Sequence, residues 1–314
     1  MLYPYKFQPI LIERLWGGTA LARYGKAIPP GKRIGESWEI SDRTDAQSVV
    51  ANGPAAGQTL RQLIENLGAD VIIGRARPPG APRFPLLIKL LDARERLSLQ
   101  VHPPAALAAL LGGEPKTEMW YILDAAPDSV LIAGLRRGVT RQQFEAAIRQ
   151  GGAAFKKCFH QFPVQVGEAL FVPSGRLHAI GAGLVIAEIQ QNSDTTYRVY
   201  DWDRGDDKGQ PRALHVRESL ASIDFDDSEP APTPLPIRCA DFVVEKLEIS
   251  GAVAGRCDGT SFQILGGITG EVVITAGNFR EKLRPGEFVL LPAELGDYQL
   301  VGTVSPAKVL RVSV

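Results

Sequence analysis

Short apolar runs separated by Gly and Pro dominate this chain. Runs rich in Val, Ile, Leu and Phe are bounded by turn-forming residues, and 32 glycines and 23 prolines lie among the 314 residues. Branched and aromatic residues favour strands, whereas Gly and Pro mark the turns between them. The pattern therefore predicts a mainly β protein built from many short strands.

Helical periodicity is confined to three segments. Residues 59–67 place Leu60, Leu63, Ile64 and Leu67 at the spacing of one helix face. Residues 140–149 begin at Thr140, a residue type that commonly caps helix N-termini. A third helix is expected over residues 212–223. We expect these helices to decorate a sheet rather than to form a core of their own.

A proline-rich segment divides the chain at residues 226–236. Proline occupies every second position from Pro230 to Pro236, which prevents regular strand pairing and favours an extended polyproline conformation. We therefore expect a first domain with N-terminal strands and helical insertions over residues 1–228. A linker is expected over residues 229–237, and a smaller β-rich domain over residues 238–314.

The C-terminal stretch repeats part of the first domain. Gly286-Glu-Phe-Val-Leu-Leu-Pro292 parallels Gly167-Glu-Ala-Leu-Phe-Val-Pro173. Such an internal repeat predicts a second copy of one fold. The same offset leads from His178 to Asp297, and no histidine follows His215 in the sequence. The second copy is thus expected to keep the fold without a metal, and to pack against the first domain or a partner subunit.

Composition limits the partners and the compartment. Lys plus Arg equals Asp plus Glu at 35 each, without a long basic run, which argues against nucleic acid as a partner. The N-terminal segment is broken by charged residues and prolines, unlike a signal peptide, and no run approaches the ~20 apolar residues of a membrane span. Three widely spaced cysteines, an odd number, fit reduced thiols in the cytoplasm: Cys158, Cys239 and Cys257.

Gln100 and His102 are the first two candidates for metal ligation. Successive side chains of a strand point to opposite faces, so both project the same way from the run LSLQVHP. Glu118 begins the strand-like run TEMWYIL. A turn at residues 126–129 and a second apolar run, VLIAGL, follow, which predicts a hairpin with an acid at its base.

His178 completes the candidate metal site. It closes the segment from Gly167, in which Gly and Pro shape a strand and a tight turn. Two imidazoles, a carboxylate and an amide oxygen suit a borderline divalent ion such as zinc, with one position left open for water or substrate. His160 and His215 lack such a framework and are interpreted as ordinary surface or core histidines.

The segment from Gly167 to His178 matches the second cupin motif, although Ala182 stands where that motif ends in Asn. The first cupin motif is altered, with Gln100-x-His102 in place of His-x-His and the acid 16 positions later. In this alteration the chain resembles the short bacterial branch of the type I mannose-6-phosphate isomerases. The similarity extends, in the family's order, over ERLWGG (13–18), GESWE (35–39), PLLIK (85–89), LSLQVHP (97–103) and YRVYDW (197–202).

The resemblance implies a fold, a metal and a reaction. The expected fold is a cupin (jelly-roll) barrel followed by a second, smaller cupin-like domain. The expected cofactor is one Zn²⁺ per chain, bound by Gln100, His102, Glu118 and His178. The implied reaction interconverts mannose 6-phosphate and fructose 6-phosphate through an enediolate, although free mannose as substrate would leave the same ligand pattern. The expected partner is a small sugar phosphate, and the protein is expected to be a monomer or homodimer.

The reaction moves a proton between C1 and C2 and needs a stabilised enediolate. By resemblance, Arg198 is the family's catalytic arginine, and Lys116 its lysine two residues before the glutamate ligand. Lys116 shares a strand face with Glu118, so the charge of a bound ion would lower its pKa and let it shuttle a proton. The alternative is that Lys116 only holds the substrate. Asp194 and Glu188 are both candidates for the general base, and either could instead orient a neighbouring group.

Phosphate binding needs cations and hydroxyls here, because neither GxxxxGK[ST] nor GxGxxG occurs. Lys89 and Ser98 match residues near the phosphate in the family. A lysine within an apolar strand is costly to bury unless it is paired, so Lys89 is expected to face a ligand or an acid, with a snorkelling edge lysine as the alternative. Trp16 is expected to wall the pocket or to fill the barrel end, and Trp38 is interpreted as structural.

Two other classes of protein share parts of this pattern. A cupin that binds a sugar without turnover needs the barrel but not the whole set of Lys89, Lys116, Glu118 and Arg198. A metal oxidoreductase of the germin or dioxygenase kind uses more histidines and a redox metal. The presence of all four residues and of an amide ligand favours the isomerase.

Overall fold

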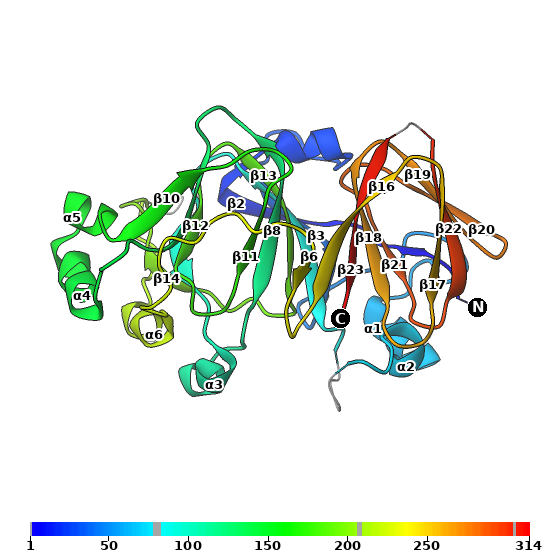
Figure 1. The fold of residues 1–314 in the computed structure, drawn as a ribbon, viewed down its shortest axis with the longest axis horizontal. Coiled ribbons are helices and arrows are strands. Elements are labelled where there is room, and N and C mark those ends of the chain that lie inside the picture. Colours follow the sequence, from blue (N-terminus) through cyan, green and yellow to red (C-terminus); the bar gives the residue numbers. More distant parts are fainter. Residues whose placement is uncertain (1, 78–82, 206–208, 304–305) are drawn as a thin grey trace.

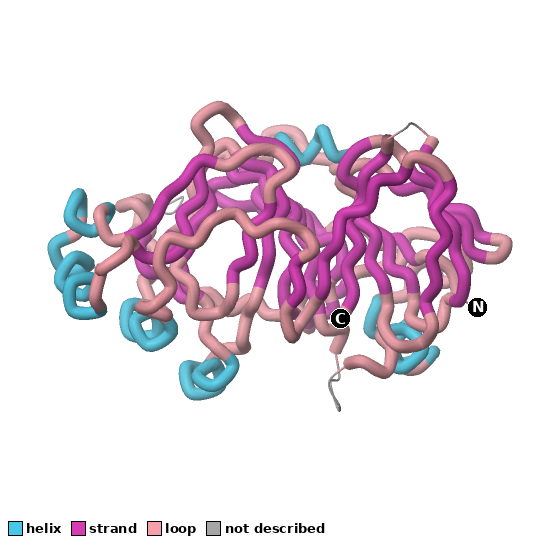
Figure 2. The backbone as a smooth tube through the Cα atoms, viewed as in Figure 1, coloured by secondary structure: helices cyan, strands magenta, loops and turns pink. Residues whose placement is uncertain are grey.

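Two β-barrels lie side by side in the computed structural model, which describes residues 2–77, 83–205, 209–303 and 306–314 (Figure 1). Strands dominate both barrels, and the helices lie at their periphery (Figure 2). The prediction of a mainly β fold with a second barrel is therefore confirmed.

Two sheets make the first barrel, and every strand pairing within them is antiparallel. In hydrogen-bonded order, one sheet contains β11 (Ala169–Val172), β8 (Glu118–Ala125), β13 (Leu184–Gln191), β6 (Leu86–Ala93), β3 (Ile34–Ile40) and β2 (Ile10–Gly18). The other contains β10 (Phe159–Pro163), β9 (Val130–Leu135), β12 (His178–Ile180), β7 (Leu99–Val101) and β14 (Tyr197–Tyr200).

The second barrel repeats this topology. One sheet contains β1 (Tyr5–Lys6), β21 (Phe288–Leu291), β18 (Gln263–Thr269), β23 (Ala307–Ser313), β16 (Val243–Ile249) and β15 (Ile237–Arg238). The other contains β17 (Ala252–Cys257), β22 (Gly296–Gly302), β19 (Val272–Ala276) and β20 (Phe279–Leu283). The order β21-β18-β23-β16 thus corresponds to β11-β8-β13-β6, and β20-β19-β22-β17 to β10-β9-β12-β7. A separate two-stranded ribbon joins β4 (Asp42–Arg43) to β5 (Ala46–Gln47).

The two copies differ at the cross-strand position of the candidate ligands. His178 on β12 lies opposite Gln100 on β7. On the corresponding strands, Asp297 lies opposite Arg256, and the two form an exposed ion pair of 2.7 Å. That the second barrel lacks a metal stays a prediction.

The barrels pack against each other through the outer faces of two sheets. One apolar cluster includes side chains of β6, β8 and β13 together with side chains of β18, β21 and β23. Phe84 and Phe262 meet in this contact with ring centroids 4.5 Å apart. A buried ion pair lies beside it, in which Lys26 Nζ contacts Glu39 at 2.7 Å and donates to the Gly286 carbonyl at 2.8 Å.

Helices cover the ends and one face of the barrels. They are α1 (Leu60–Leu67), α2 (Ala69–Ile72), α3 (Ala105–Ala108), α4 (Arg141–Gln150), α5 (Gly152–Lys156) and α6 (Val216–Ser222), with 3₁₀ turns η1 (Ala20–Tyr24) and η2 (Ala109–Leu111). Thr59 and Thr140 each form a capping box, which confirms the helix N-cap predicted at Thr140. Helices α4 and α5 bury Phe144 and Phe155 against the outer face of the β7/β9/β12 sheet. None of the helices described has the length and apolar content to cross a bilayer.

The helix expected over residues 212–223 is shorter than predicted. It spans Val216–Ser222. Arg212 binds Asp201 instead, and the His215 amide donates to the Arg198 carbonyl, so the chain before residue 216 is held against β14.

The prediction of a β-hairpin over residues 118–135 is wrong. A turn does follow β8, but β8 and β9 belong to different sheets. The reason is that β11 and β13 already pair with both edges of β8, leaving no edge for β9. The turn therefore carries the chain across the barrel, and its Ala126 amide bonds to the Gly183 carbonyl.

The proline-rich segment runs along the first barrel without forming a helix or strand from residue 229 to 236. Thr233 fixes it there, because its amide donates to the Ala169 carbonyl and its hydroxyl accepts from the Phe171 amide. Near the other end of the chain, β1 pairs with β21 of the second barrel. The division into domains at residues 228 and 238 stays a prediction.

Candidate active site

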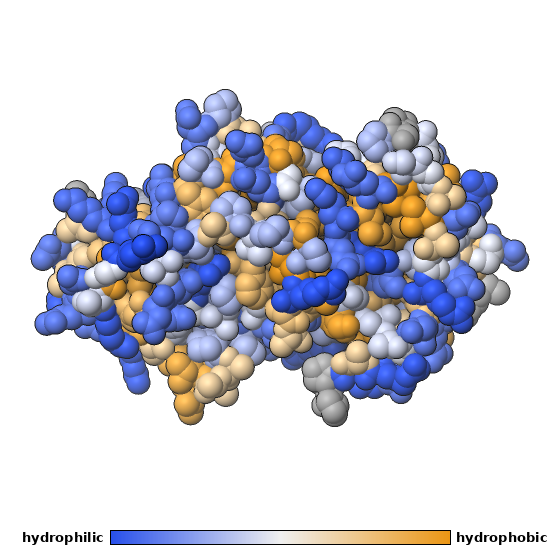
Figure 3. All heavy atoms as spheres, viewed as in Figure 1, coloured by the Kyte–Doolittle hydropathy of each residue, from blue (hydrophilic) through white to orange (hydrophobic). Residues whose placement is uncertain are grey.

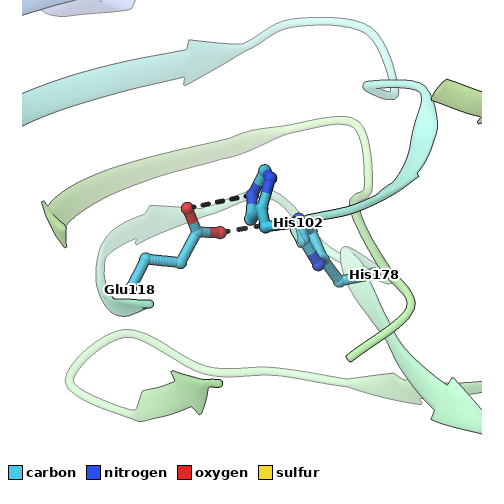
Figure 4. A group of neighbouring side chains, drawn as sticks. All are labelled: His102, Glu118 and His178. Carbon is cyan, nitrogen blue, oxygen red and sulfur yellow. Dashed lines mark ion pairs between the residues drawn. The ribbon is translucent and has the colours of Figure 1, made fainter. Parts of the chain in front are cut away.

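Three buried side chains converge inside the first barrel: His102, Glu118 and His178 (Figure 4). His102 follows β7, Glu118 begins β8 and His178 begins β12. One potential ligand atom from each lies within 4.8 Å of the others. Elsewhere in the described ranges, no group of His, Cys, Asp and Glu side chains meets this spacing. The predicted ligands are therefore brought together from three strands.

A glycine turn aims His178 at the cluster. Gly175 has a φ of 90°, which a side chain would strain, and its amide donates to the His102 carbonyl at 2.9 Å. This bond ties the turn before β12 to the end of β7. The His178 Nδ1 lies 2.8 Å from the Arg176 carbonyl oxygen, to which it donates a hydrogen bond. The Nε2 of His178 is thereby left unprotonated for a ligand.

The geometry of Glu118 fits a cation. Its oxygens lie 3.3 Å from His102 Nε2 and 3.5 Å from His178 Nε2. Neither oxygen makes a hydrogen bond of acceptable geometry, and neither nitrogen of His102 does so, although all four atoms are buried. Buried polar atoms without partners are rare and costly. A divalent ion between them would satisfy the carboxylate and the imidazole together.

Burial and neighbouring charges keep the two histidines and Glu118 in the protonation states that bind a metal. Burial, aided by the Lys116 ammonium, lowers the pKa of His102 to about 3, and burial also lowers the pKa of His178. Burial alone would raise the pKa of Glu118, but Lys116 and the two histidines together outweigh it and hold that pKa well below its usual range. At neutral pH the imidazoles are therefore neutral and the carboxylate is ionised, as metal binding requires.

Gln100 lies against this cluster as predicted. Its Nε2 is 3.3 Å from His178 Nε2. A half-turn about the last side-chain bond exchanges the amide nitrogen with Oε1, which is the atom that can ligate a metal. Gln100 therefore offers a fourth ligand without movement of β7.

Lys116 also meets the cluster. Its Nζ lies 3.0 Å from Glu118 Oε2, in keeping with the shared strand face that the sequence indicated. Burial opposes its charge, but Glu118 and then Glu188 outweigh burial, so the pKa of Lys116 is raised. The lowering expected from a bound ion concerns the loaded site and stays a prediction.

Lys89 is paired with acids, not exposed at an edge. It lies on β6, between β3 and β13, and only 4% of it is exposed. Its Nζ is 3.4 Å from Glu188 and 3.7 Å from Glu36, and it lies 5.0 Å from the ring centroid of Trp38. The Trp38 indole donates to Glu36 at 2.7 Å, so Trp38 helps to hold the pair.

Glu188 links the Lys89 end of the site to the metal end. Its carboxylate accepts from the Trp120 indole at 2.9 Å and pairs with Lys89. Burial, followed by the charge of Glu118, raises its pKa. A carboxyl of raised pKa can take and return a proton close to neutral pH.

A cavity of about 360 Å³ opens above these residues. Ser98 and Trp16 both line it, as do the amide of Gln100 and the ammonium groups of Lys89 and Lys116. Trp16 packs with the apolar interior of the barrel at the same time, so it walls the cavity and fills the barrel end.

Arg198 and Asp194 lie on another wall of this cavity. The Arg198 guanidinium donates to the Ala213 carbonyl at 2.8 Å, and its Nε is buried without a hydrogen bond. Burial, with Arg212 nearby, lowers the pKa of Arg198. Asp194 is exposed, unlike Glu188.

Four further polar residues line the cavity without having been assigned a place there from the sequence: Arg14, Glu36, Thr196 and Arg212. Arg14 precedes Trp16 by two positions on β2 and so shares its strand face, which is the signal that would have found it. The others carry no comparable local signal.

The remaining histidines are outside the cluster. His160 stacks on Phe162 on β10, and His215 Nδ1 accepts from the Arg198 amide at 3.1 Å. A larger cavity, of about 650 Å³, lies between the proline-rich segment and β16. It contains none of the candidate ligands, so we assign the site by its chemistry rather than by volume.

Two family models match the chain. "Phosphomannose isomerase type I, catalytic domain" matches residues 5–126, and "Mannose-6-phosphate isomerase, cupin domain" matches residues 232–311. Mannose-6-phosphate isomerase ManA of Bacillus subtilis (strain 168) is 37% identical over 312 residues, which cover 95% of this chain and 96% of that protein. The chain belongs to the type I phosphomannose isomerase family. The resemblance inferred from the sequence is thus confirmed.

Other members of the family agree over their full length. The mannose-6-phosphate isomerase of Streptococcus mutans is 34% identical, with 96% of each chain covered. The crystal structure of the mannose 6-phosphate isomerase from Bacillus subtilis superposes with a TM-score of 0.87 at 31% identity, covering 99% of each chain. A protein described as a putative mannosephosphate isomerase from Archaeoglobus fulgidus has the same fold, with a TM-score of 0.81 at 23% identity.

Proposed function

We propose that this protein interconverts mannose 6-phosphate and fructose 6-phosphate. The observation that carries the proposal is the buried cluster of His102, Glu118 and His178, whose neighbours Gln100 and Lys116 line a cavity rich in cationic side chains. Membership of the phosphomannose isomerase family supports the same substrate.

The metal is proposed to be zinc, one ion per chain, held by Gln100, His102, Glu118 and His178. Two neutral imidazoles and two oxygen ligands suit this ion and leave a position free for substrate. When bound, a divalent ion supplies Lewis-acid polarisation of the sugar oxygens at C1 and C2.

The remaining roles follow from position and charge. Lys89 and Ser98 are proposed to bind the phosphate group, and Trp16 to exclude water from the sugar carbons. Arg198 is proposed to stabilise the negative charge of the enediolate. Lys116, beside Glu118, is proposed to pass a proton to and from the sugar oxygens.

Two carboxylates can act as the base at C1 and C2. Glu188 is buried, is oriented by Trp120 and has a raised pKa. Asp194 stands exposed at the cavity wall. We propose Asp194 as a catalytic residue, with Glu188 as its alternative. Comparing Asp194→Asn with Glu188→Gln decides between them: the base is the residue whose substitution abolishes exchange of the substrate's C2 proton with solvent.

A coupled assay tests the function. Metal-stripped protein is expected to lose turnover of mannose 6-phosphate and to regain it when zinc is added, with fructose 6-phosphate as the product. Free mannose, assayed in parallel, is expected to be a much poorer substrate. Equal kcat/KM for mannose would assign the enzyme to the free sugar. Binding of mannose 6-phosphate without turnover by the zinc-loaded protein would show a sugar-binding cupin instead.

A further inference from the structure

Arg14 reaches the cavity across a glycine. It lies on β2, two positions before Trp16, and both side chains pass over Gly35 on β3. A Cβ at Gly35 would lie 2.6 Å from the Arg14 Cβ and 2.8 Å from the Trp16 ring. The absence of a side chain at this position therefore allows both residues to line the cavity.

The guanidinium of Arg14 forms a hydrogen bond through Nε but not through its two terminal nitrogens. Its Nε donates to Glu36 Oε1 at 2.7 Å. In the described part of the chain, no acceptor contacts its two terminal nitrogens, and 35% of the side chain is exposed. Arg14 therefore has several free donors, held in one orientation, on the cavity wall.

Three of the other four cations of the cavity are paired with acids. Lys116 contacts Glu118, Arg212 binds Asp201, and Lys89 lies between Glu36 and Glu188. The lining side chains comprise five cations (Arg14, Lys89, Lys116, Arg198, Arg212) and three acids (Glu36, Glu188, Asp194), a net charge of +2. The cavity is thus suited to a dianion. Among the described contacts both terminal nitrogens of Arg14 are free to meet it, whereas Arg198 uses one terminal nitrogen to donate to the Ala213 carbonyl.

Glu36 holds Arg14 and Lys89 together. Arg14 contacts its Oε1, whereas Lys89 and the Trp38 indole contact its Oε2. Burial would raise the pKa of Glu36, but Lys89 and Arg14 outweigh it and lower that pKa to about 2. The carboxylate is ionised at neutral pH, so it positions both cations at the end of the contact network remote from the metal cluster.

We propose that Arg14 binds the phosphate group of the substrate together with Lys89, and that it selects phosphorylated over free hexose. The phosphate of a hexose 6-phosphate lies at the opposite end of the sugar from C1 and C2, which matches this separation. A guanidinium donates two parallel hydrogen bonds to a phosphate, which an ammonium cannot. This inference rests on the proposed function.

Steady-state kinetics of zinc-loaded Arg14→Met and Arg14→Lys test the proposal. The phosphate group does not react, so its contacts with the protein stabilise the bound substrate and the transition state equally. Loss of such a contact raises KM and changes kcat little. For Arg14→Met we expect KM for mannose 6-phosphate to rise about tenfold or more. The Ki of inorganic phosphate should rise by a similar factor, whereas zinc content should be unchanged. Arg14→Lys keeps the positive charge but loses the planar guanidinium, so its KM and Ki should lie between those of Arg14→Met and the wild type.

Arg23→Met is the matched control. It removes one arginine from the same N-terminal segment, but Arg23 pairs with Asp124 outside the cavity and is 62% exposed. Unchanged KM and Ki in Arg14→Met, or an equal change in the control, would overturn the proposal. So would a loss of kcat alone, because it would show a structural disturbance. The proposed function fails by a separate result: no turnover of mannose 6-phosphate by the zinc-loaded wild type.

Discussion

At the scale of single residues, Lys116 is placed to affect both the metal site and the sugar. Its ammonium is buried 3.0 Å from Glu118 Oε2 and feels the charge of Glu188 as well. A proton donor this close to the candidate metal ligand Glu118 can reach the oxygens of a substrate that binds to an ion at this site.

Lys116→Met is expected to keep zinc and to lower kcat by about 100-fold or more, because general acid–base catalysis typically contributes at least that factor. Zinc analysis and the coupled assay on one sample measure both quantities. Lys32→Met, which removes an exposed lysine paired with Glu13, is the control. Near-normal turnover with zinc retained would remove Lys116 from the proton path.

Acid should destabilise the metal-free protein through His102. The unfolded chain takes up this proton near the ordinary pKa of 6.5, whereas the folded imidazole does so only near 3. Between these values the unfolded state binds more protons, so stability rises with pH. The contribution is present above about pH 6.5 and is lost as the pH falls toward 3, with a slope of up to about 1.4 kcal/mol per pH unit.

Urea denaturation of metal-free protein across this range measures the slope. His102→Asn should flatten it, while His160→Asn, on the outer strand β10, should not. An identical slope in wild type and His102→Asn would contradict the assignment of a buried neutral imidazole.

The candidate ligands could be predicted from local signals, and residues such as Lys89 and Arg198 from the family resemblance, whereas the contacts between them could not. Gln100 and His102 share a face by the period of two, and His178 ends a recognisable turn. Glu188 was named only as a candidate base, and Glu36 had no role assigned, because a strand period shows which face a residue takes but not what lies opposite. Their pairing with Lys89 depends on which strands flank β6.

At the scale of elements, the turn before β12 controls the position of His178. Gly175 adopts a φ of 90° there and bonds to the His102 carbonyl. Gly138, in the turn before α4, has a similar φ of 84° but nothing lies within 4 Å of the place where its Cβ would be.

Gly175→Ala should therefore lose both stability and zinc affinity, and Gly138→Ala only stability. The left-handed backbone costs an alanine about 1–2 kcal/mol in each case. Urea denaturation and zinc titration with a competing chelator measure the two effects. Equal zinc affinities in the two variants would show that the turn does not position the ligand.

Local sequence patterns predicted the positions of helices and turns better than the pairing of strands. The helices predicted at residues 59–67, from apolar spacing, and at 140–149, from the cap at Thr140, agree with α1 and α4 within one residue at each end. The turn at residues 126–129 was also found, but its strands were wrongly paired, because a turn marks a reversal and not the sheet that receives the next strand. Short helices such as α3 and α5 lack the length for a visible period.

At the scale of the whole molecule, the two barrels share one apolar contact. The cluster between the sheets joins residues of both copies, and fully buried Phe84 and Phe262 meet within it. By contrast, apolar atoms gather on the surface near α3 (Figure 3), where Leu110 is 82% exposed.

Phe262→Ala should lower the free energy of unfolding by about 3–5 kcal/mol, the usual cost of a large cavity in a core. Leu110→Ala should change it by less than about 0.5 kcal/mol. Because the contact couples the barrels, activity and the far-UV circular dichroism signal of the strands in both barrels should be lost together in urea. Two separated transitions in the wild type would show that the barrels unfold independently.

The repeat of one barrel was visible in the sequence, since the two Gly-Glu-x-x-x-x-Pro strings lie on corresponding strands β11 and β21. The way in which the two barrels pack against each other was not visible in the sequence. Apolar side chains that fill the interior of a barrel and apolar side chains that pack one barrel against another give the same pattern along a strand. The crossing of β1 into the second barrel carried no local signal either.

Zinc content and mannose 6-phosphate isomerisation of His178→Ala, measured beside His160→Ala, test the central claim most directly. We predict that His178→Ala neither retains zinc after dialysis nor forms fructose 6-phosphate, whereas His160→Ala matches the wild type in both. A His178→Ala protein that binds one zinc per chain and turns over the substrate would contradict the account.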